Sequence, residues 1–551
     1  MKEKKTIARR EFLENIGKSA GTLAMLRTMI AMGLGLGSSA CGSSSAGAAQ
    51  QPANISSTNI TNNTVAVNNS TSIIKSPRPG DWNTNIGNGK TVIILGAGIA
   101  GMSSAFELQK LGYTVTILEA TNRAGGRNRT IRSGDSINEL NSTQTCIFDS
   151  DSELYFNPGP ARIAHHHEFL LDYCRQFGVI LENFTNDNRA ALVHSTLAFD
   201  GKPQLAKSVL SDIRGRISSL LAYAVNQNVL DQQLSSNDKI NILRMLKGFG
   251  DLNSDHLYLG SSRAGFLGQE NVGSRDRDTP VTPKTLQELI ISGFQSGLDF
   301  SQGINQQPAM LQPKGGMDKI AQAFEARVLS VLTYNAEVTQ IRKITNGVKI
   351  IYERNGSSFE NTADFCVCTI PAPVLKNISN DFSNEHQLEI EQFQYSSASK
   401  LAFQSRRFWE QDHSIFGGIS WTNQSITQLW YPSNALGSAS GIIVGAYIWN
   451  NSVANIFSDQ TPQARITSAL QQGNNLHSEY QNEVSRGISV AWKNIPFQLG
   501  AYGQSSATKL LIPDDNIIFA GEHLSALKGW QEGAILSAYH AINEIVKKSS
   551  A

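Results

Sequence analysis

Three glycines and one acid near position 100 have the residue types and the spacing that bind a dinucleotide. Gly96, Gly98 and Gly101 belong to the run Gly-Ala-Gly-Ile-Ala-Gly. Glu119 follows at close to the roughly 20-residue distance expected of an acid that binds a ribose hydroxyl. Glycines at these places allow a tight turn and a close approach of the pyrophosphate, and the N–H groups that begin the next helix favour phosphate. The pattern therefore predicts a dinucleotide site.

The elements that must position these residues lie on both sides of the glycines. Residues 91–95 are an apolar run of strand length, and residues 102–111 have a helical pattern that Gly112 ends. Residues 115–118 supply a second strand. A glycine motif alone would indicate only a turn. With two strands, a helix and the acid in register, the segment predicts a Rossmann-type α/β domain with a parallel sheet.

The segment after the second strand resembles a motif of the flavin amine oxidase superfamily. Residues 123–127 (Arg-Ala-Gly-Gly-Arg) are similar to the superfamily's second fingerprint, which contacts FAD. Further motifs follow in the family's order at 314–318, at Val338, at 517–523 and at 529–534. Within the superfamily, the chain resembles most closely the bacterial L-amino acid oxidases of the flavin monoamine oxidase family. The resemblance implies that FAD is the cofactor.

The same resemblance implies which residues contact FAD. They belong to the glycine loop, the end of the second strand, the segment around residue 160, the motif at Val338 and the C-terminal motifs. The implied contacts are Gly96, Gly98, Ile99, Ala100, Gly101, Glu119, Ala120, Gly126, Arg127, Gly159, Pro160, Ala161, Arg162, Val338, Glu522, Gly529, Trp530, Gln531, Glu532, Gly533 and Ala534.

The passage 156–163 (Phe-Asn-Pro-Gly-Pro-Ala-Arg-Ile) is the motif that distinguishes an enzyme for amino acid substrates from one for simple amines. In L-amino acid oxidases and the related aromatic amino acid monooxygenases, the arginine of this motif binds the substrate carboxylate, and Arg162 has that place. A planar guanidinium can hold a carboxylate through two charge-assisted hydrogen bonds. The resemblance implies that Tyr447 adds a second contact to the carboxylate and that Gly529 and Trp530 bind the substrate beside the flavin. A surface arginine paired with an acid, and a core tyrosine, are the alternatives.

Lys400 is the predicted catalytic residue. Its context, Ser-Lys-Leu-Ala-Phe, aligns with a superfamily lysine that hydrogen-bonds a water close to flavin N5. A cation at that place is suited to stabilising charge when reduced flavin meets oxygen. The alternative is a strand lysine whose ammonium group reaches solvent. Trp492 resembles a further family tryptophan near FAD, with core packing as its alternative.

The implied reaction is the FAD-dependent oxidative deamination of an L-amino acid. Hydride passes from the substrate Cα to flavin N5, oxygen reoxidises the flavin to give hydrogen peroxide, and water converts the imino acid into a 2-oxo acid and ammonia. One alternative is an amino acid 2-monooxygenase of the tryptophan or phenylalanine type, which releases an amide and carbon dioxide. Others are an amine or polyamine oxidase and a flavin-binding surface protein without turnover.

Composition limits the partners. The 551 residues carry a net charge of +1, with 17% charged and 40% hydrophobic residues. This balance gives no basis for nucleic acid binding, so we expect a small-molecule amino acid and O2 as partners, with a homodimer as one option for the assembly. No run of about 18 apolar residues follows position 90, so we expect no transmembrane helix in the mature domain.

Residues 1–42 resemble an export signal of the twin-arginine type. Residues 8–13 (Ala-Arg-Arg-Glu-Phe-Leu) follow a lysine-rich start and precede a mildly apolar stretch. We therefore expect a periplasmic or secreted protein, with lipid attachment through Cys41 as an option. Residues 43–88 are rich in Ser, Asn, Thr, Ala and Gln, which predicts a disordered, low-complexity spacer.

The apolar patterns after the spacer predict two interleaved domains. We expect the FAD-binding domain to consist of residues 89–170, 305–345 and 500–551. Residues 171–304 have helical periods, and residues 346–499 contain strand-like runs. These two inserts predict a substrate domain of a mixed sheet plus helices, and the flavin ring would lie in the cleft between the domains.

The sequence predicts no metal site. Cys366 and Cys368 alternate along a predicted strand, so both point to one face and belong to the core. His165, His166 and His167 are expected on a helix, where adjacent side chains point in different directions and form a solvated or partly buried face.

Overall fold

The computed structural model describes residues 82–266, 279–294 and 299–550. The predicted export signal, Cys41 and most of the predicted spacer lie outside the described residues. In the described part of the chain, no helix combines the length and the apolar character that a membrane span requires.

A five-stranded parallel sheet forms the centre of the predicted nucleotide-binding domain. Its order is β10 (Leu332–Thr333), β2 (Thr114–Leu118), β1 (Thr91–Leu95), β14 (Phe365–Cys368) and β21 (Ile517–Phe519), and each neighbouring pair is parallel. All of β14 and all but the first residue of β1 are buried. Continuous apolar runs of this kind are typical of parallel strands that are covered on both faces. The predicted Rossmann-type sheet is therefore confirmed.

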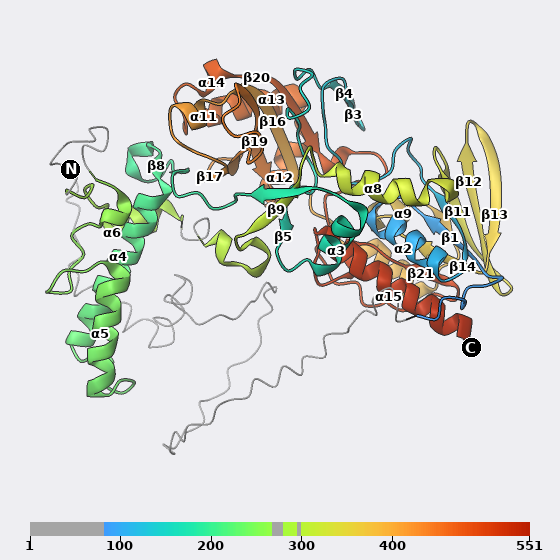
Figure 1. The fold of residues 1–551 in the computed structure, drawn as a ribbon, viewed down its shortest axis with the longest axis horizontal. Helices are drawn as coiled ribbons and strands as arrows, with labels where there is room; N and C mark the ends of the chain where they lie inside the picture. Colours follow the sequence, from blue (N-terminus) through green and yellow to red (C-terminus); the bar gives the residue numbers. More distant parts are fainter. Residues whose placement is uncertain (1–81, 267–278, 295–298, 551) are drawn as a thin grey trace. The chain divides into compact units, whose positions relative to one another are not determined.

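Helices cover one face of this sheet, where α2 and α15 lie side by side (Figure 1). They are α2 (Ile99–Lys110), α3 (Glu168–Phe177), α8 (Asp318–Val328) and α15 (Gln531–Ser550). Their apolar side chains share one buried cluster with side chains of β1 and β14. This packing holds the start of α2, where the glycine motif lies, against the end of β1.

A four-stranded sheet covers the other face. Its order is β13 (Ser357–Ala363), β12 (Gly347–Arg354), β11 (Glu337–Ile344) and β15 (Ser379–Asn380). The first three strands pair antiparallel, and β15 is parallel to β11. Ile93 of β1 belongs to the same buried cluster as side chains of β11 and β12.

One part of the expected domain boundary is corrected by β14. This strand falls within residues 346–499, which the sequence pattern places in the substrate domain, yet it is the strand between β1 and β21 of the parallel sheet. Asp364 explains the register at its start, because its carboxylate accepts hydrogen bonds from the backbone N–H and the hydroxyl of Thr91, both at 2.7 Å. After residues 346–363, which lie outside this sheet, the chain therefore returns to the nucleotide-binding sheet.

The remaining large sheet has seven strands and lies in the predicted substrate domain. In spatial order they are β20 (Val484–Ala491), β16 (Ser399–Arg406), β19 (Ser440–Ile448), β18 (Gln428–Tyr431), β17 (Gly418–Thr422), β7 (Leu192–His194) and β8 (Gln204–Leu205). Side chains of α12 (Asn451–Ser458) and α13 (Pro462–Gly473) share a buried cluster with this sheet. Lys400 and Tyr447 are paired across β16 and β19.

The predicted helical insert contains α4 (Ala206–Asn226), α5 (Ser236–Gly250) and α6 (Leu286–Ser292). Shorter elements connect the sheets and helices. They are β3 (Ser136–Glu139), β4 (Ser142–Thr145), β5 (Ile163–Ala164), β6 (Leu181–Phe184), β9 (Met310–Pro313), α9 (Ala372–Leu375), α10 (Asn384–Gln392), α11 (Phe408–Gln411) and α14 (Tyr480–Glu483).

The four cysteines in the described part of the chain are free and buried. Cys366 and Cys368 belong to one apolar cluster, so the prediction that they are core residues on one face is confirmed. Cys146 and Cys174 pack in two other clusters.

Candidate active site

The glycine loop between β1 and α2 is tightly packed at Gly101 and faces open space at Gly98. A Cβ at Gly101 would lie 2.0 Å from the carbonyl oxygen of Gly96, so only glycine fits there. At Gly98, the N-cap of α2, a Cβ would meet no atom of the described chain within 4 Å. No side chain caps this helix start in the described structure. The loop therefore leaves room and unshared N–H groups for an anionic ligand.

Glu119 lies at the end of β2 and faces the glycine loop. One carboxylate oxygen accepts a hydrogen bond from the Ala97 N–H at 2.8 Å, and the other accepts one from the Thr121 N–H at 2.9 Å. The backbone oxygen of Glu119 accepts a hydrogen bond from Ala336, which places the predicted contact Val338 on the neighbouring β11. The sheet thus brings Glu119 to the loop as the sequence predicts.

An ion pair joins the N-terminal and C-terminal motifs. The Arg127 guanidinium lies 2.7 Å from a carboxylate oxygen of Glu522 and also donates to the carbonyl oxygen of Ala501. The same carboxylate accepts hydrogen bonds from the N–H groups of Gly503 and Gly529. Glu522 therefore fixes several loops that are distant in sequence around one edge of the parallel sheet.

The predicted contacts around residue 160 are fixed by two side chains of the seven-stranded sheet and its continuation. The Trp492 indole N–H donates to the carbonyl oxygen of Pro158 at 2.9 Å. The Lys400 ammonium group donates to the carbonyl oxygens of Gly159 at 2.7 Å and Asn157 at 3.2 Å. A Cβ at Gly159 would lie 2.0 Å from the carbonyl oxygen of Arg127, so glycine is required for this approach.

Residues 529–534, which are predicted to cover the flavin, also form hydrogen bonds to other segments of the chain. The Glu532 carboxylate accepts hydrogen bonds from the N–H groups of Phe169 and Leu170 in the first turn of α3. A carboxylate is favourable at a helix N-terminus, so this predicted cofactor contact also fixes α3. The Gln531 side-chain oxygen accepts a hydrogen bond from the Asn128 amide.

Arg162 is buried, and aromatic rings surround its guanidinium. The guanidinium carbon lies 4.6 Å from the ring centroid of Trp430, 5.5 Å from that of Phe300 and 5.7 Å from that of Trp530. Its Nε and Nη2 donate to the side-chain oxygen of Gln306 at 3.0 and 2.7 Å. In the described part of the chain, no carboxylate forms an ion pair with Arg162, so the alternative of an arginine paired with an acid finds no support.

Lys400 is a second buried cation of the same region. Its ammonium nitrogen lies 4.7 Å from the ring centroid of Tyr447 and 5.2 Å from that of Trp430, the ring that also contacts Arg162. The alternative of a lysine that reaches solvent is excluded, because Lys400 is only 4% exposed.

Burial shifts the pKa values of the ionisable side chains in this region. Burial, with the nearby Arg162 charge, holds the pKa of Lys400 well below the usual lysine value. Burial also lowers the pKa of Arg162 to about 10 and raises that of Tyr447 to about 12. Two cations that are costly to bury form a site that would be stabilised by an incoming anion.

Several residues of this region were not predicted from the sequence. Gln306 and Trp430 contact Arg162 from distant parts of the chain, and no motif marks them. His167 is fully buried, with its ring centroid 4.9 Å from that of Trp530, and burial lowers its pKa to about 3. The expected helix at residues 165–167 is wrong, because His165 and His166 form a turn and His167 is the N-cap of α3, which begins at Glu168.

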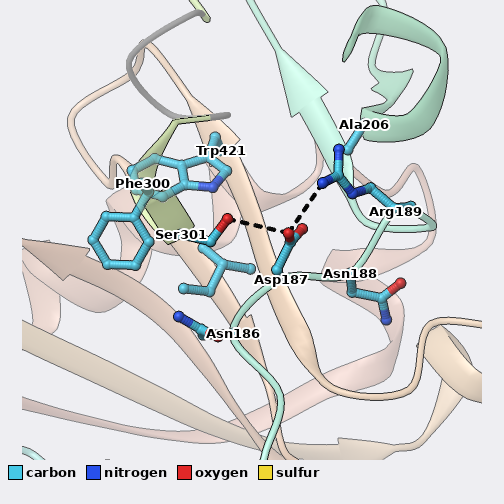
Figure 2. A pocket seen from close by; sticks show the side chains of 9 residues that line it. Asn186, Asp187, Asn188, Arg189, Ala206, Phe300, Ser301 and Trp421 are labelled. Atoms are coloured by element: carbon cyan, nitrogen blue, oxygen red, sulfur yellow. Dashed lines mark hydrogen bonds and ion pairs between the residues drawn. The ribbon is translucent and has the colours of Figure 1, made fainter. Parts of the chain in front are cut away.

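A small pocket adjoins the surroundings of Arg162 through the shared residue Phe300. Figure 2 shows Asp187 at its centre, with Ser301 and Arg189 directed toward the carboxylate at 3.1 and 3.2 Å. The lining residues are Asn186, Asp187, Asn188, Arg189, Ala206, Phe300, Ser301, Ile419 and Trp421. The Asn186 amide donates to the backbone oxygen of Gln306, so the pocket wall also holds the residue that binds Arg162.

Comparison with known proteins agrees with this geometry. The model of the flavin containing amine oxidoreductase family matches residues 99–546. The chain is 26% identical over 487 residues to the flavin-dependent L-tryptophan oxidase of Lentzea aerocolonigenes, covering 83% of this chain and 98% of that protein. It is 24% identical over 488 residues to the L-amino-acid oxidase of Siganus canaliculatus, covering 83% and 85%. The solved cyclohexylamine oxidase of Brevibacterium oxydans IH-35A has a similar fold, with a TM-score of 0.56, 15% identity, and coverage of 84% and 100%.

The residues of the site fit FAD as the cofactor. The open face of the loop at Gly98 and the free start of α2 would hold the pyrophosphate, and Glu119 would hold the ribose. The Arg127–Glu522 pair brings the two predicted FAD motifs to one place. The segment around Gly159 links this nucleotide site to Lys400 and Arg162.

Two glycine substitutions separate folding from cofactor binding. Gly101→Ala forces a Cβ against the Gly96 carbonyl, so we expect a lower free energy of unfolding for the FAD-free protein. The Cβ of Gly98→Ala would meet no described atom within 4 Å, so we expect FAD-free stability within about 1 kcal/mol of wild type but at least about tenfold weaker FAD binding. Denaturant unfolding and FAD titration measure the two effects. Wild-type FAD affinity in Gly98→Ala would contradict the assignment of the loop.

Lys400 should contribute a specific pH dependence to stability. Its folded-state pKa is depressed, so the unfolded chain binds the proton more tightly and stability rises with pH up to the unfolded lysine pKa of about 10.4. Each pKa unit of depression contributes about 1.4 kcal/mol to this rise. We expect the rise in free energy of unfolding between neutral pH and pH of about 10 to be smaller in Lys400→Met. Equal rises in the two proteins, measured by denaturant unfolding, would show that Lys400 titrates normally.

Proposed function

Because the chain belongs to the flavin-containing amine oxidoreductase family and uses FAD, we propose that it catalyses the oxidative deamination of an L-amino acid. The products would be a 2-oxo acid, ammonia and hydrogen peroxide. Relatives named L-amino-acid oxidase and L-tryptophan oxidase that align over most of their length support this choice.

The observation that carries the proposal is the buried Arg162 guanidinium without an acidic partner in the described chain. A substrate carboxylate would supply the missing negative charge and two charge-assisted hydrogen bonds. An amine or polyamine would instead bring a further positive charge toward Arg162 and Lys400, which are both buried. Like charges in a buried site disfavour one another, so the region favours a substrate with an acid group.

Each residue of the site would have its own role in the reaction. Arg162, helped by the nearby Tyr447 hydroxyl, would bind the carboxylate and so fix the orientation of the Cα. The Trp530 ring would form an apolar wall for the substrate. Lys400 would stabilise negative charge that develops during the reaction, since its ammonium group is held in place by two carbonyl oxygens. When bound, FAD supplies the acceptor for the hydride and passes the electrons on to oxygen.

The proposal is tested by an anaerobic screen of the twenty common L-amino acids against the purified holoenzyme. We expect at least one to bleach the flavin absorbance, and we expect a 2-oxo acid, ammonia and hydrogen peroxide after oxygen is admitted. An amide with carbon dioxide would instead identify an amino acid 2-monooxygenase. Bleaching by tyramine or spermidine, with none by any amino acid, would identify an amine oxidase.

Gln306→Glu should weaken amino acid binding by placing a carboxylate against Arg162. The wild-type amide oxygen lies 2.7 Å from Nη2, so a carboxylate there would neutralise the guanidinium and compete with the substrate acid group. We expect the KM for the best amino acid to rise about tenfold or more, which corresponds to about 1.4 kcal/mol of lost binding.

Gln306→Met is the matched control, because it removes the hydrogen bond without adding charge. We expect its KM to change much less than that of Gln306→Glu, as measured by initial rates of peroxide formation. Equal KM values in the two variants would argue against a carboxylate at Arg162.

A further inference from the structure

A cluster of two histidines and one glutamate lies beside the seven-stranded sheet, outside the site described above. His413 Nε2 is 2.5 Å from a carboxylate oxygen of Glu479, and His477 Nδ1 is 3.8 Å from the same oxygen. One potential ligand atom from each residue lies within 4.8 Å of the others. The two imidazole rings have centroids 4.8 Å apart.

The His477 ring is fixed with one nitrogen directed at the cluster. Its Nε2 lies 2.7 Å from the Tyr431 hydroxyl, which lies 2.7 Å from the Ser420 hydroxyl. If Nε2–H donates to Tyr431 and the Tyr431 hydroxyl donates to Ser420, Nδ1 is left with a bare lone pair. His477 is 2% exposed, and in the described structure its Nδ1 has no hydrogen-bond partner. Buried polar atoms normally have a partner, so this Nδ1 lone pair is available to a ligand.

We propose that His413 Nε2, His477 Nδ1 and a Glu479 carboxylate oxygen bind one divalent cation of the zinc class. Two imidazoles and one carboxylate are a ligand set that suits Zn2+, with water as a fourth ligand. The Tyr431–Ser420 hydrogen bonds supply the outer contacts that orient a metal-binding histidine. This site departs from the sequence-based prediction of no metal, because the three residues come from segments that no short motif joins.

The position of the cluster indicates a structural role for the metal. His413 follows α11, which follows β16, and Glu479 precedes α14, which leads into β20. The two strands pair near this end through Ser405 and Val484, whereas Lys400 pairs with Val490 toward the other end of the ladder. A metal here would therefore join the ends of β16 and β20 that are distant from the candidate active site.

Zinc titration of chelator-treated holoenzyme by calorimetry tests the proposal. We expect one Zn2+ per chain with micromolar or tighter affinity, and we expect binding to weaken at least about tenfold in His413→Ala and in Glu479→Gln. Zinc should also raise the Tm of the wild-type holoenzyme by about 2 to 4 °C and leave the Tm of both variants nearly unchanged.

His256→Asn is the matched control, since it removes a histidine outside the cluster and asparagine tolerates the positive φ of 59° found there. This variant should bind zinc as the wild type does. His413 is exposed at the surface, so its loss should not prevent folding, and retained flavin absorbance verifies this. No zinc binding at about 100 μM would overturn the proposal, as would equal affinity in wild type, His413→Ala and Glu479→Gln.

Discussion

Two buried basic side chains without an acidic partner in the described chain are the constraint on which the rest of this site depends. The Arg162 guanidinium is held by one amide oxygen and faces aromatic rings, and the Lys400 ammonium group is held by two backbone carbonyl oxygens. Neutral oxygens and ring faces hold a cation in place without cancelling its charge. The arrangement lowers the stability of the free protein, and that cost is offset once an anion enters. Under the proposed function, substrate preference would follow from this charge rather than from the shape of the substrate side chain.

The fold keeps these charges in place by joining distant segments at the edges of its sheets. The Arg127–Glu522 pair holds the first and last motifs together, and Trp492 and Lys400 fix the backbone around Gly159. Because Lys400 of β16 binds the backbone at Gly159, and Gly159 lies against the Arg127 carbonyl, these contacts link the charged region to the nucleotide-binding motifs. Chemistry that depends on a cofactor and on a bound acid group needs such a link.

The parts of the site that lie within short motifs could be predicted, because local sequence determines them. The glycine loop, Glu119 and the strands β1 and β2 follow from apolar runs and from backbone approaches that only glycine allows. Gln306 and Trp430 could not be predicted, since tertiary packing alone brings them to Arg162. The helix expected at His165 was wrong, as three adjacent histidines have no periodicity to separate a turn from a helix. Similarly, the sequence places β14 in the wrong domain, because nothing local shows which sheet a buried apolar run joins.

Comparing an L-amino acid with its decarboxylated amine tests the role of Arg162 most directly. The measurement is the anaerobic rate of flavin reduction by the best amino acid and by the corresponding amine, in wild type and in Arg162→Met. The charge constraint predicts that wild type strongly prefers the amino acid and that the preference falls by about a hundredfold or more in the variant, with amine reduction maintained or improved. An unchanged preference in Arg162→Met would contradict the account, because the buried guanidinium would then not be the group that selects the acid.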